Sequence, residues 1–393
     1  MKETLIWLMS ALCLPLSPGN ATAQTPQDTT YRIDSQVFET ERRIRVYVPP
    51  RYNIDTDIPF VPIYLLDAQA DMVWNVTKGN LEYLVQQFTI IPSILIGIVS
   101  DDRGSEFSPN STALQQHFET EVFPLIEKEY RVANVKAVIG HSWGGAFVGN
   151  TLFGEKRDLF DAYFGISPSF DANNNVIYRA ADSLLQVAPH FGKFFYFSSG
   201  DVGSERKYLQ DNQRMDSLLS LYPSPSLAWK VQHFSDLDHF SSVGPALANG
   251  LVSMSRHYRA DQKVMLNMAH RSEKDFASQM DAFYQSRDSL FGFSYRPIVG
   301  YYKYVADQLR NREMYTAAIA TYQIGLARNP KHLSSLIGLA ETYLRMEDKE
   351  RARPLLEKLS KELEFQKDNI SMGFYKTHSK WVREKLRAAR RGE

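Results

Sequence analysis

The chain has 393 residues, which is long enough for two domains and a large apolar core. Basic and acidic residues balance at 45 each, so charge gives no indication of a nucleic-acid partner or an anionic membrane surface. The single cysteine, Cys13, lies in the apolar N-terminal stretch, so no disulfide, cysteine nucleophile or thiolate metal site is expected downstream.

The first residues have the features of a secretory signal peptide. Lys2 provides a positive start, residues 5–16 form a short apolar run, and Ala21-Thr22-Ala23 matches an A-x-A cleavage site. The apolar run is too short to span a membrane, and Leu12 before Cys13 makes a poor lipoprotein box. We therefore expect residues 1–23 to be removed and the protein to be exported without a lipid anchor or an integral membrane segment.

Downstream of the signal, the pattern is that of an α/β domain. Residues 31–38 and 42–48 alternate between apolar and polar and predict an antiparallel strand pair. The remaining predicted strands are short apolar runs at residues 60–66, 91–99, 135–139, 162–166, 193–197 and 229–234. Predicted helices lie between them at residues 72–88, 114–130 and 208–221. This alternation predicts one mostly parallel sheet with helices on both faces.

After about residue 260 the strand signals end and the pattern is helical, beginning with a predicted helix at residues 274–290. Residues 301–363 then contain a repeat with a 34-residue period, in which Val305, Ala306, Leu309, Ala318 and Tyr322 recur as Leu339, Ala340, Tyr343, Ala352 and Leu356. The period and the residue sizes resemble tetratricopeptide repeats (TPR), and an ordinary helical hairpin is the alternative. The basic, amphipathic residues 374–391 predict a helix that caps this small all-α domain.

One short motif carries most of the functional information. Gly140-His141-Ser142-Trp143-Gly144 lies between the predicted strand at 135–139 and a predicted helix at 144–153. In a strand–turn–helix setting, G-x-S-x-G is a nucleophile elbow, a turn so tight that glycine is needed two residues to each side of the serine. The turn exposes the hydroxyl, so we predict that Ser142 is a nucleophile.

A serine hydroxyl is a poor nucleophile at neutral pH and needs a neighbouring base and an orienting acid. With this motif the chain order is serine, acid, histidine. His239 follows the predicted strand at 229–234 and is therefore the candidate base. His190 precedes a strand, His233 lies within one and His257 lies on a helix, so none of them is placed as well.

The loop after the predicted strand at 193–197 offers two acids. Glu205 and Asp201 can each reach the histidine, and either can instead cap the following helix. Asp238 is adjacent to His239 in sequence and is unsuited to orient its ring. We place Glu205 first and keep Asp201 as the alternative.

Hydrolysis of an ester puts negative charge on the former carbonyl oxygen, and this charge needs N–H donors aimed at it. We predict that the backbone N–H groups of Trp143 and Ala68 form this oxyanion hole. Asp67, Arg103 and His141 are expected near the substrate pocket, although Asp67 can instead shape its loop and His141 can be a packing residue. The sequence has no metal-ligand spacing and no glycine-rich phosphate loop, so we expect no cofactor.

Several segments together resemble the enterochelin-esterase and esterase-D-like group of α/β-hydrolases. They are residues 45–52, 63–68, 118–130, 140–145 and 166–169, together with Arg103 and Phe107-Ser108-Pro109. The resemblance spans about residues 31–258 and implies the α/β-hydrolase sandwich and hydrolysis of carboxylic esters. Family members act on siderophore lactones, acylated sugars or small thioesters. Two departures are that Ala68 stands at a usual glycine and that the acid loop differs from the family pattern.

By this resemblance, Ser142, His239 and the amides of Trp143 and Ala68 take the family roles. An esterase joined to a repeat segment also resembles exported proteins of Gram-negative bacteria of the Bacteroidetes type, which implies a periplasmic location. We divide the chain into a signal peptide (1–23), an α/β-hydrolase domain (28–260), a helical linker (261–298) and a TPR-like domain (299–393).

The expected function is that of an exported serine esterase acting on a small-molecule ester through an acyl-enzyme. Two alternatives stay open. The same triad can transfer the acyl group to a sugar or lipid alcohol. The chain can also be a non-catalytic scaffold whose TPR-like domain binds a protein partner through its concave face.

Overall fold

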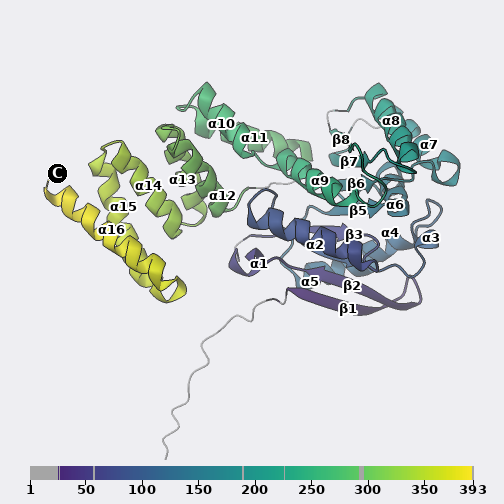
Figure 1. The fold of residues 1–393 in the computed structure, drawn as a ribbon, viewed down its shortest axis with the longest axis horizontal. Helices are drawn as coiled ribbons and strands as arrows, with labels where there is room; N and C mark the ends of the chain where they lie inside the picture. Colours follow the sequence, from purple (N-terminus) through teal and green to yellow (C-terminus); the bar gives the residue numbers. More distant parts are fainter. Residues whose placement is uncertain are drawn as a thin grey trace, which may run out of the picture.

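The computed structural model describes residue 25 and residues 27–55, 58–187, 190–224, 226–291 and 296–391. The predicted signal peptide, residues 1–23, lies outside the described residues. The described part consists of an α/β domain followed by an all-helical segment (Figure 1). None of the described helices is long and apolar enough to cross a membrane.

An eight-stranded sheet with the order β1-β2-β4-β3-β5-β6-β7-β8 forms the centre of the α/β domain. Its strands are β1 (Asp28–Ser35), β2 (Thr40–Tyr47), β3 (Val61–Leu65), β4 (Ser93–Ile98), β5 (Ala137–His141), β6 (Ala162–Ile166), β7 (Lys193–Ser199) and β8 (Leu227–His233). The pairs β1–β2 and β2–β4 are antiparallel, and every other pair is parallel. The predicted fold class is confirmed.

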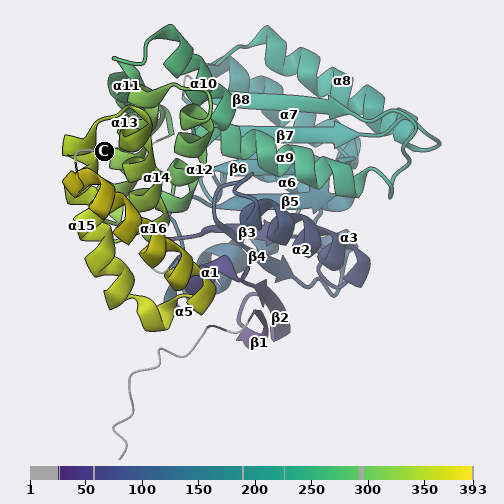
Figure 2. The ribbon, with the colours of Figure 1, turned by 60° about the vertical axis from the view of Figure 1, so that its left-hand side comes forward.

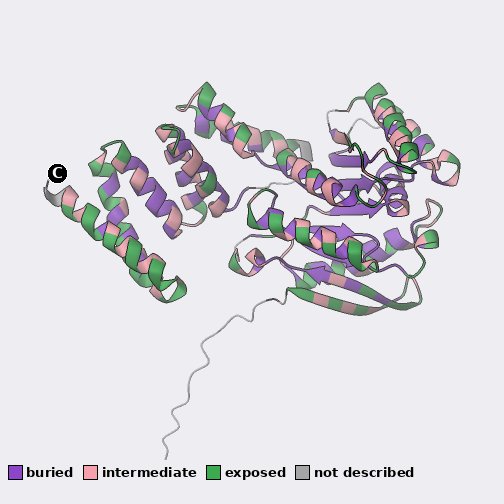
Figure 3. Cartoon of the chain, in the orientation of Figure 1, coloured by how far each residue is buried: buried purple, intermediate pink, exposed green. Residues whose placement is uncertain are grey.

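Helices cover both faces because strands β3 to β7 are apolar and buried along their whole length, as Figure 3 shows. On one face α2 (Asp71–Gln86) packs beside α9 (Val243–Tyr258). The other face is covered by α5 (Phe123–Glu129), α6 (Trp143–Phe153), α7 (Ala172–Val187) and α8 (Glu205–Leu221). The edge strand β1 instead alternates between exposed and half-buried residues, as its sequence pattern predicts.

Four short elements complete this domain, namely α1 (Arg51–Ile54), α3 (Arg103–Glu106), α4 (Ala113–His117) and the π-helical turn η1 (Phe118–Val122). The last two lie within the helix at 114–130 that the sequence predicts as continuous, and they divide it from α5. Pro124 lies in the first turn of α5 and has no N–H to donate to the carbonyl of Thr120. A continuous α-helix would need that hydrogen bond, so the helix widens there.

Helices α10 to α16, which we name the helical array, follow the sheet domain. They are α10 (Gln262–Arg271), α11 (Phe276–Phe291), α12 (Val299–Arg310), α13 (Tyr315–Arg328), α14 (Leu333–Arg345), α15 (Lys349–Phe365), the 3₁₀ turn η2 (Lys367–Asn369) and α16 (Met372–Arg391). The starts of α12 and α14, and those of α13 and α15, are each 34 residues apart. The ten residues that recur in the sequence are all buried. Helices α10 and α11, in the predicted linker, pack against α12 and α13.

Arg259, which follows α9, joins the array to the sheet domain. Its side chain is buried and donates hydrogen bonds to the carbonyl oxygens of Phe88, Thr89 and Ile90, just before β4. Its guanidinium lies 4.2 Å from the ring centre of Tyr301 on α12. The array is therefore attached where the parallel strands begin, away from α3, which follows the end of β4 (Figures 1 and 2). It leaves the edge formed by the strand ends uncovered.

Replacing Arg259 with methionine should lower the free energy of unfolding by about 2–4 kcal/mol, because three buried carbonyl groups lose a charged donor. Arg256→Met is the matched control, because Arg256 is largely exposed and pairs with Asp261 at 3.0 Å. The control should cost less than about 1 kcal/mol. Urea denaturation followed by circular dichroism measures both. Equal small losses would contradict this role of Arg259.

Candidate active site

Ser142 occupies the turn between β5 and α6. Its backbone has φ of 58° and ψ of −114°, a conformation that residues other than glycine rarely adopt. The turn needs glycine at positions 140 and 145, whereas a Cβ on Gly144 would make only ordinary contacts at 3.5 Å, so the structure does not bear out the expected need for glycine two residues after the serine. A Cβ on Gly140 would lie 2.1 Å from the carbonyl oxygen of Gly144, and one on Gly145 would lie 2.6 Å from the Cα of Pro168. The predicted strand–turn–helix geometry of the elbow is therefore present, and the serine stands at its apex.

His239 lies in the loop between β8 and α9 and is hydrogen bonded to Glu205, the first residue of α8. His239 Nδ1 and Glu205 Oε1 are 2.6 Å apart, and the glutamate is fully buried. Glu205 Oε2 accepts hydrogen bonds from Ser167 Oγ and from the backbone N–H of Gly200, both at 2.7 Å. Burial raises the pKa of Glu205, but these hydrogen bonds outweigh it and hold the pKa below its ordinary value.

Because Glu205 is ionised and can only accept a hydrogen bond, the hydrogen of this contact lies on Nδ1 of His239. The imidazole lies next to the elbow. The rings of His239 and His141 have centres 4.3 Å apart, and His141 Nε2 donates to the carbonyl oxygen of His239 at 2.9 Å. Among the described residues Ser142 Oγ makes no hydrogen bond to His239. Nucleophile–base contacts often shorten only when substrate is bound.

Tyr208 is a neighbour of the base that sequence reasoning missed. Its ring stacks on His239 with centres 4.8 Å apart and planes inclined by 21°. Ser167, the donor to Glu205, was missed as well. The signal available for Tyr208 was its spacing, since it lies three residues after Glu205 and therefore on the same face of α8. No comparable local signal marks Ser167.

Asp201, the alternative acid, contacts the loop that leads to His239 and not the imidazole. Asp201 Oδ1 accepts a hydrogen bond from the backbone N–H of Asp236 at 2.8 Å. Its other oxygen lies 3.5 Å from His233 Nε2. Asp236 has a positive φ of 63°, so this contact supports a strained turn. The geometry therefore favours Glu205 as the orienting acid and makes Asp201 a brace of the same loop.

The two amides predicted for the oxyanion hole differ. Trp143 is the first residue of α6, where an N–H group has no acceptor within the helix. The N–H of Ala68, in contrast, donates to the carbonyl oxygen of Ile98 at 3.0 Å and is not free to bind an oxyanion. The chain turns at Asp67, whose φ is 62°, and this directs the Ala68 amide back to β4. Among the described residues, the N–H groups of Asp67 and Gln69 have no acceptor and are available instead.

Asp67, Arg103 and His141 lie near the elbow but engage protein groups. Arg103 binds Asp67 through two hydrogen bonds, one from Nε to Oδ1 at 2.8 Å and one from Nη2 to Oδ2 at 2.9 Å. Burial and the neighbouring His239 lower the pKa of His141 to about 4, so His141 is neutral at pH 7. In the described part of the chain, no three histidine, cysteine or acidic side chains form a cluster that could hold a metal ion.

Folding stability should fall as the pH drops from about 6.5 to 4, in part through His141. Its folded pKa of about 4 lies below the ordinary 6.5, so in this window the unfolded chain binds one more proton at this position. The contribution is complete above pH 6.5 and is lost as the pH falls. His141→Asn should reduce the pH slope by up to about 1.4 kcal/mol per pH unit.

Urea unfolding between pH 4 and 7 measures this slope. His257 provides a parallel case, because burial and the charge of Arg287 lower its pKa to about 4 as well. His257→Asn should reduce the slope by a similar amount, and the double variant by more than either single variant. An unchanged slope in both single variants would show that neither histidine titrates in this way.

Comparison with known proteins agrees with the geometry of the fold. Residues 35–242 match the family described as "Putative esterase". A siderophore enterobactin esterase of Emericella nidulans is 31% identical over 143 residues, which cover 30% of this chain and 46% of that protein. The match thus spans less than half of the length of that curated relative.

Two solved structures resemble the fold. An IroE-like serine hydrolase from Shewanella oneidensis superposes with a TM-score of 0.64 and 16% identity, over 76% of this chain and 99% of the other. An uncharacterised protein from Capnocytophaga ochracea does so with a TM-score of 0.63 and 16% identity, over 93% of this chain and 99% of its own, so the likeness extends into the helical array. Because the family match covers more than half of its length, the chain belongs to this esterase family of α/β-hydrolases.

Proposed function

We propose that the protein is a serine esterase that hydrolyses a carboxylic ester of a small molecule through an acyl-enzyme. One observation carries this proposal, namely the ionised, fully buried Glu205 bound to His239 beside a serine at the apex of a strained turn. Nucleophile, base and acid come from three different loops at one edge of the sheet. A chance serine turn does not require a histidine that is oriented by a buried carboxylate.

In the proposed mechanism, Ser142 Oγ attacks the ester carbonyl while its proton passes to Nε2 of His239. Glu205 stabilises the imidazolium that forms. The N–H of Trp143 and the N–H of Asp67 or Gln69 donate to the oxyanion. The carbon–oxygen bond of the ester then breaks, and His239 gives the proton to the leaving alcohol. Water repeats the sequence on the acyl-enzyme, releasing the acid and regenerating Ser142.

We infer that the substrate is a siderophore lactone, an acylated sugar or a similar small ester. Sequence similarity to a siderophore enterobactin esterase supports the first class. The half-buried ring of Tyr208 and the exposed ring of Phe240 lie against His239, and this suits a substrate with an aromatic or ring-shaped group. Transfer of the acyl group to another alcohol would use the same residues, and product analysis with and without an acceptor alcohol distinguishes the two reactions.

We further propose that α12 to α15 are two tetratricopeptide repeats with α16 as their cap, and that this TPR-like domain (299–393) binds a protein partner. The 34-residue offset of the helix pairs supports this proposal. Residues 28–260 would form the hydrolase domain and 261–298 the linker.

The signal sequence at residues 1–23 supports export to the periplasm. A non-catalytic scaffold stays the alternative that the next experiment excludes or supports.

Purified protein should hydrolyse p-nitrophenyl acetate and butyrate, and Ser142→Ala and His239→Ala should each lower kcat/KM by about 10⁴-fold or more. A fluorophosphonate probe should label the wild type and fail to label Ser142→Ala. Activity that survives Ser142→Ala, together with an absence of labelling in the wild type, would reject the esterase and support a scaffold.

A second pair of variants identifies the acid. Glu205→Gln should lower kcat by about 10³–10⁴-fold, because a neutral amide neither stabilises the imidazolium nor holds the correct tautomer. Asp201→Asn is the matched control and should cost less than about 10-fold, because an amide oxygen can still accept from the N–H of Asp236. Initial-rate kinetics measure both. A larger loss in Asp201→Asn would transfer the role to Asp201.

A further inference from the structure

The carboxylate of Asp67 is a buried negative charge next to the nucleophile elbow. The residue is 5% exposed and lies two residues after the end of β3. Its Oδ2 would lie 3.5 Å from a Cβ placed on Gly144, in the first turn of α6. That turn carries the Trp143 amide of the proposed oxyanion hole. An uncompensated carboxylate at this place would repel the negative charge that develops on the substrate in the transition state.

Asp67 nevertheless stabilises its own loop through hydrogen bonds. Its carbonyl oxygen accepts from the N–H of Ala70, and its Oδ1 accepts from Gln69 Nε2 at 2.8 Å. Gln69 Oε1 in turn accepts from the backbone N–H of Ser100 at 3.0 Å. The side chain therefore shapes the loop whose free amides are available for the oxyanion. The same carboxylate that builds this loop brings an unfavourable charge to it.

Arg103 cancels this charge with the bidentate contact described above, in which each oxygen of Asp67 receives one N–H of the guanidinium. The arginine begins α3, which has four residues and is too short to be stable through its own hydrogen bonds. Another contact must therefore hold α3 in place if Arg103 is to stay on Asp67.

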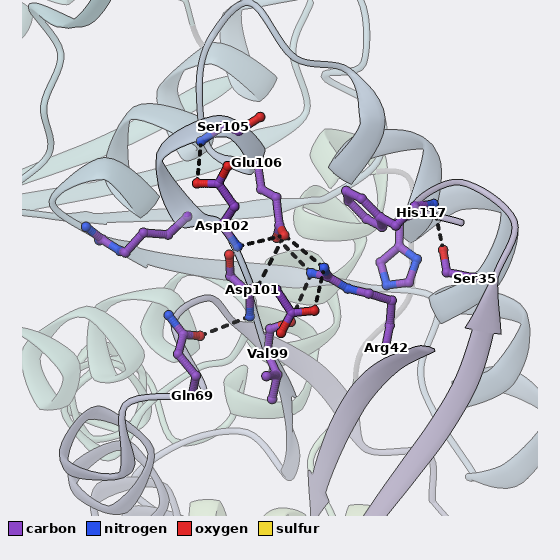
Figure 4. Close-up of polar contacts among 12 residues, drawn as sticks. Ser35, Arg42, Gln69, Val99, Asp101, Asp102, Ser105, Glu106 and His117 are labelled. Carbon is purple, nitrogen blue, oxygen red and sulfur yellow. Dashed lines mark hydrogen bonds and ion pairs between the residues drawn. The ribbon is translucent and has the colours of Figure 1, made fainter. Parts of the chain in front are cut away.

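A buried ion pair supplies that contact, as Figure 4 shows. Glu106, the last residue of α3, binds Arg42 of β2 with Oε1–Nη1 and Oε2–Nη2 distances of 2.8 and 2.7 Å. Both residues are buried, with side chains that are 2% and 6% exposed. Arg42 also donates to the carbonyl oxygen of Val99, and Glu106 accepts from the N–H groups of Asp101 and Asp102. The pair thus fastens the whole segment between β4 and α3.

We propose that Arg103 is a positioning residue of the esterase reaction, which neutralises Asp67 beside the oxyanion, and that the Arg42–Glu106 pair holds Arg103 in place. The proposal rests on the proposed function, because it concerns the transition state of that reaction. It differs from the expectation that Arg103 binds substrate. It also differs from a brace that only maintains the shape of the loop.

A double-mutant cycle on p-nitrophenyl acetate distinguishes these roles, because this ester has no anionic group for Arg103 to bind. Arg103→Met should lower kcat by about 100-fold and change KM by less than about 3-fold. Asp67→Asn should cost about 10-fold through the altered loop. The double variant Asp67→Asn/Arg103→Met should be about 10-fold faster than Arg103→Met, because the uncompensated charge is gone.

Three outcomes would overturn the proposal. A double variant no faster than Arg103→Met would make the pair a structural brace, and unchanged kcat and KM of Arg103→Met on this ester would leave Arg103 a ligand of an anionic substrate group. In both cases the wild type is active, so the proposed function would stand. A wild type without Ser142-dependent activity would overturn both.

A second experiment asks whether the Arg42–Glu106 pair acts through Arg103. It compares the loss of kcat on breaking the pair in the wild type with the loss in a background that lacks Arg103. Glu106→Gln should lower kcat by about 10-fold at unchanged KM, and should have little effect in the Asp67→Asn/Arg103→Met background. Asp101→Asn is the matched control, since Asp101 meets Arg42 at the exposed rim at 3.2 Å, and should stay within about 2-fold of the wild type. If Glu106→Gln does not fold, Arg42→Lys replaces it. A loss of equal size in both backgrounds would refute the connection.

Discussion

The hydrogen bonds of the Glu205 carboxylate join three loops into one site. The residue begins α8, yet its two oxygens bind Ser167 after β6, Gly200 after β7 and His239 after β8. These strands are neighbours in the sheet, so a single buried side chain connects the ends of all three. A buried carboxylate is tolerated only when hydrogen bonds compensate for its lost hydration, and here one of these bonds fixes the position of the histidine.

The elbow and the Asp67 loop follow the same principle of local strain supported by tertiary contacts. Ser142 and Asp67 both have positive φ values, which residues other than glycine adopt only at a cost in free energy. Closely packed glycines maintain the conformation of Ser142 at the elbow. The guanidinium of Arg103 maintains the conformation of Asp67 in its loop. The strain keeps the half-buried serine at the apex of its turn and leaves backbone amides without acceptors in the neighbouring loop, which a regular strand would not do.

The helical array is attached to the opposite end of the parallel strands. Arg259 fixes α12 against residues 88–90, which precede β4, whereas the candidate catalytic residues follow the far ends of the strands. The attachment of the array and the candidate catalytic residues therefore lie at opposite ends of the parallel strands.

By itself, the sequence determined what depends on local pattern: the order of strands and helices, the serine elbow and the 34-residue repeat. Apolar periodicity and glycine spacing are read within a few residues or within one repeat, so these predictions needed no knowledge of the fold. Only the tertiary structure decided which acid meets His239, 34 residues away, that Arg103 binds Asp67, 36 residues away, and that the amide of Ala68 belongs to the sheet. Asp201 and Glu205 share one loop and similar chemistry, and only the packing of β6, β7 and β8 beside α8 directs one of them to the imidazole.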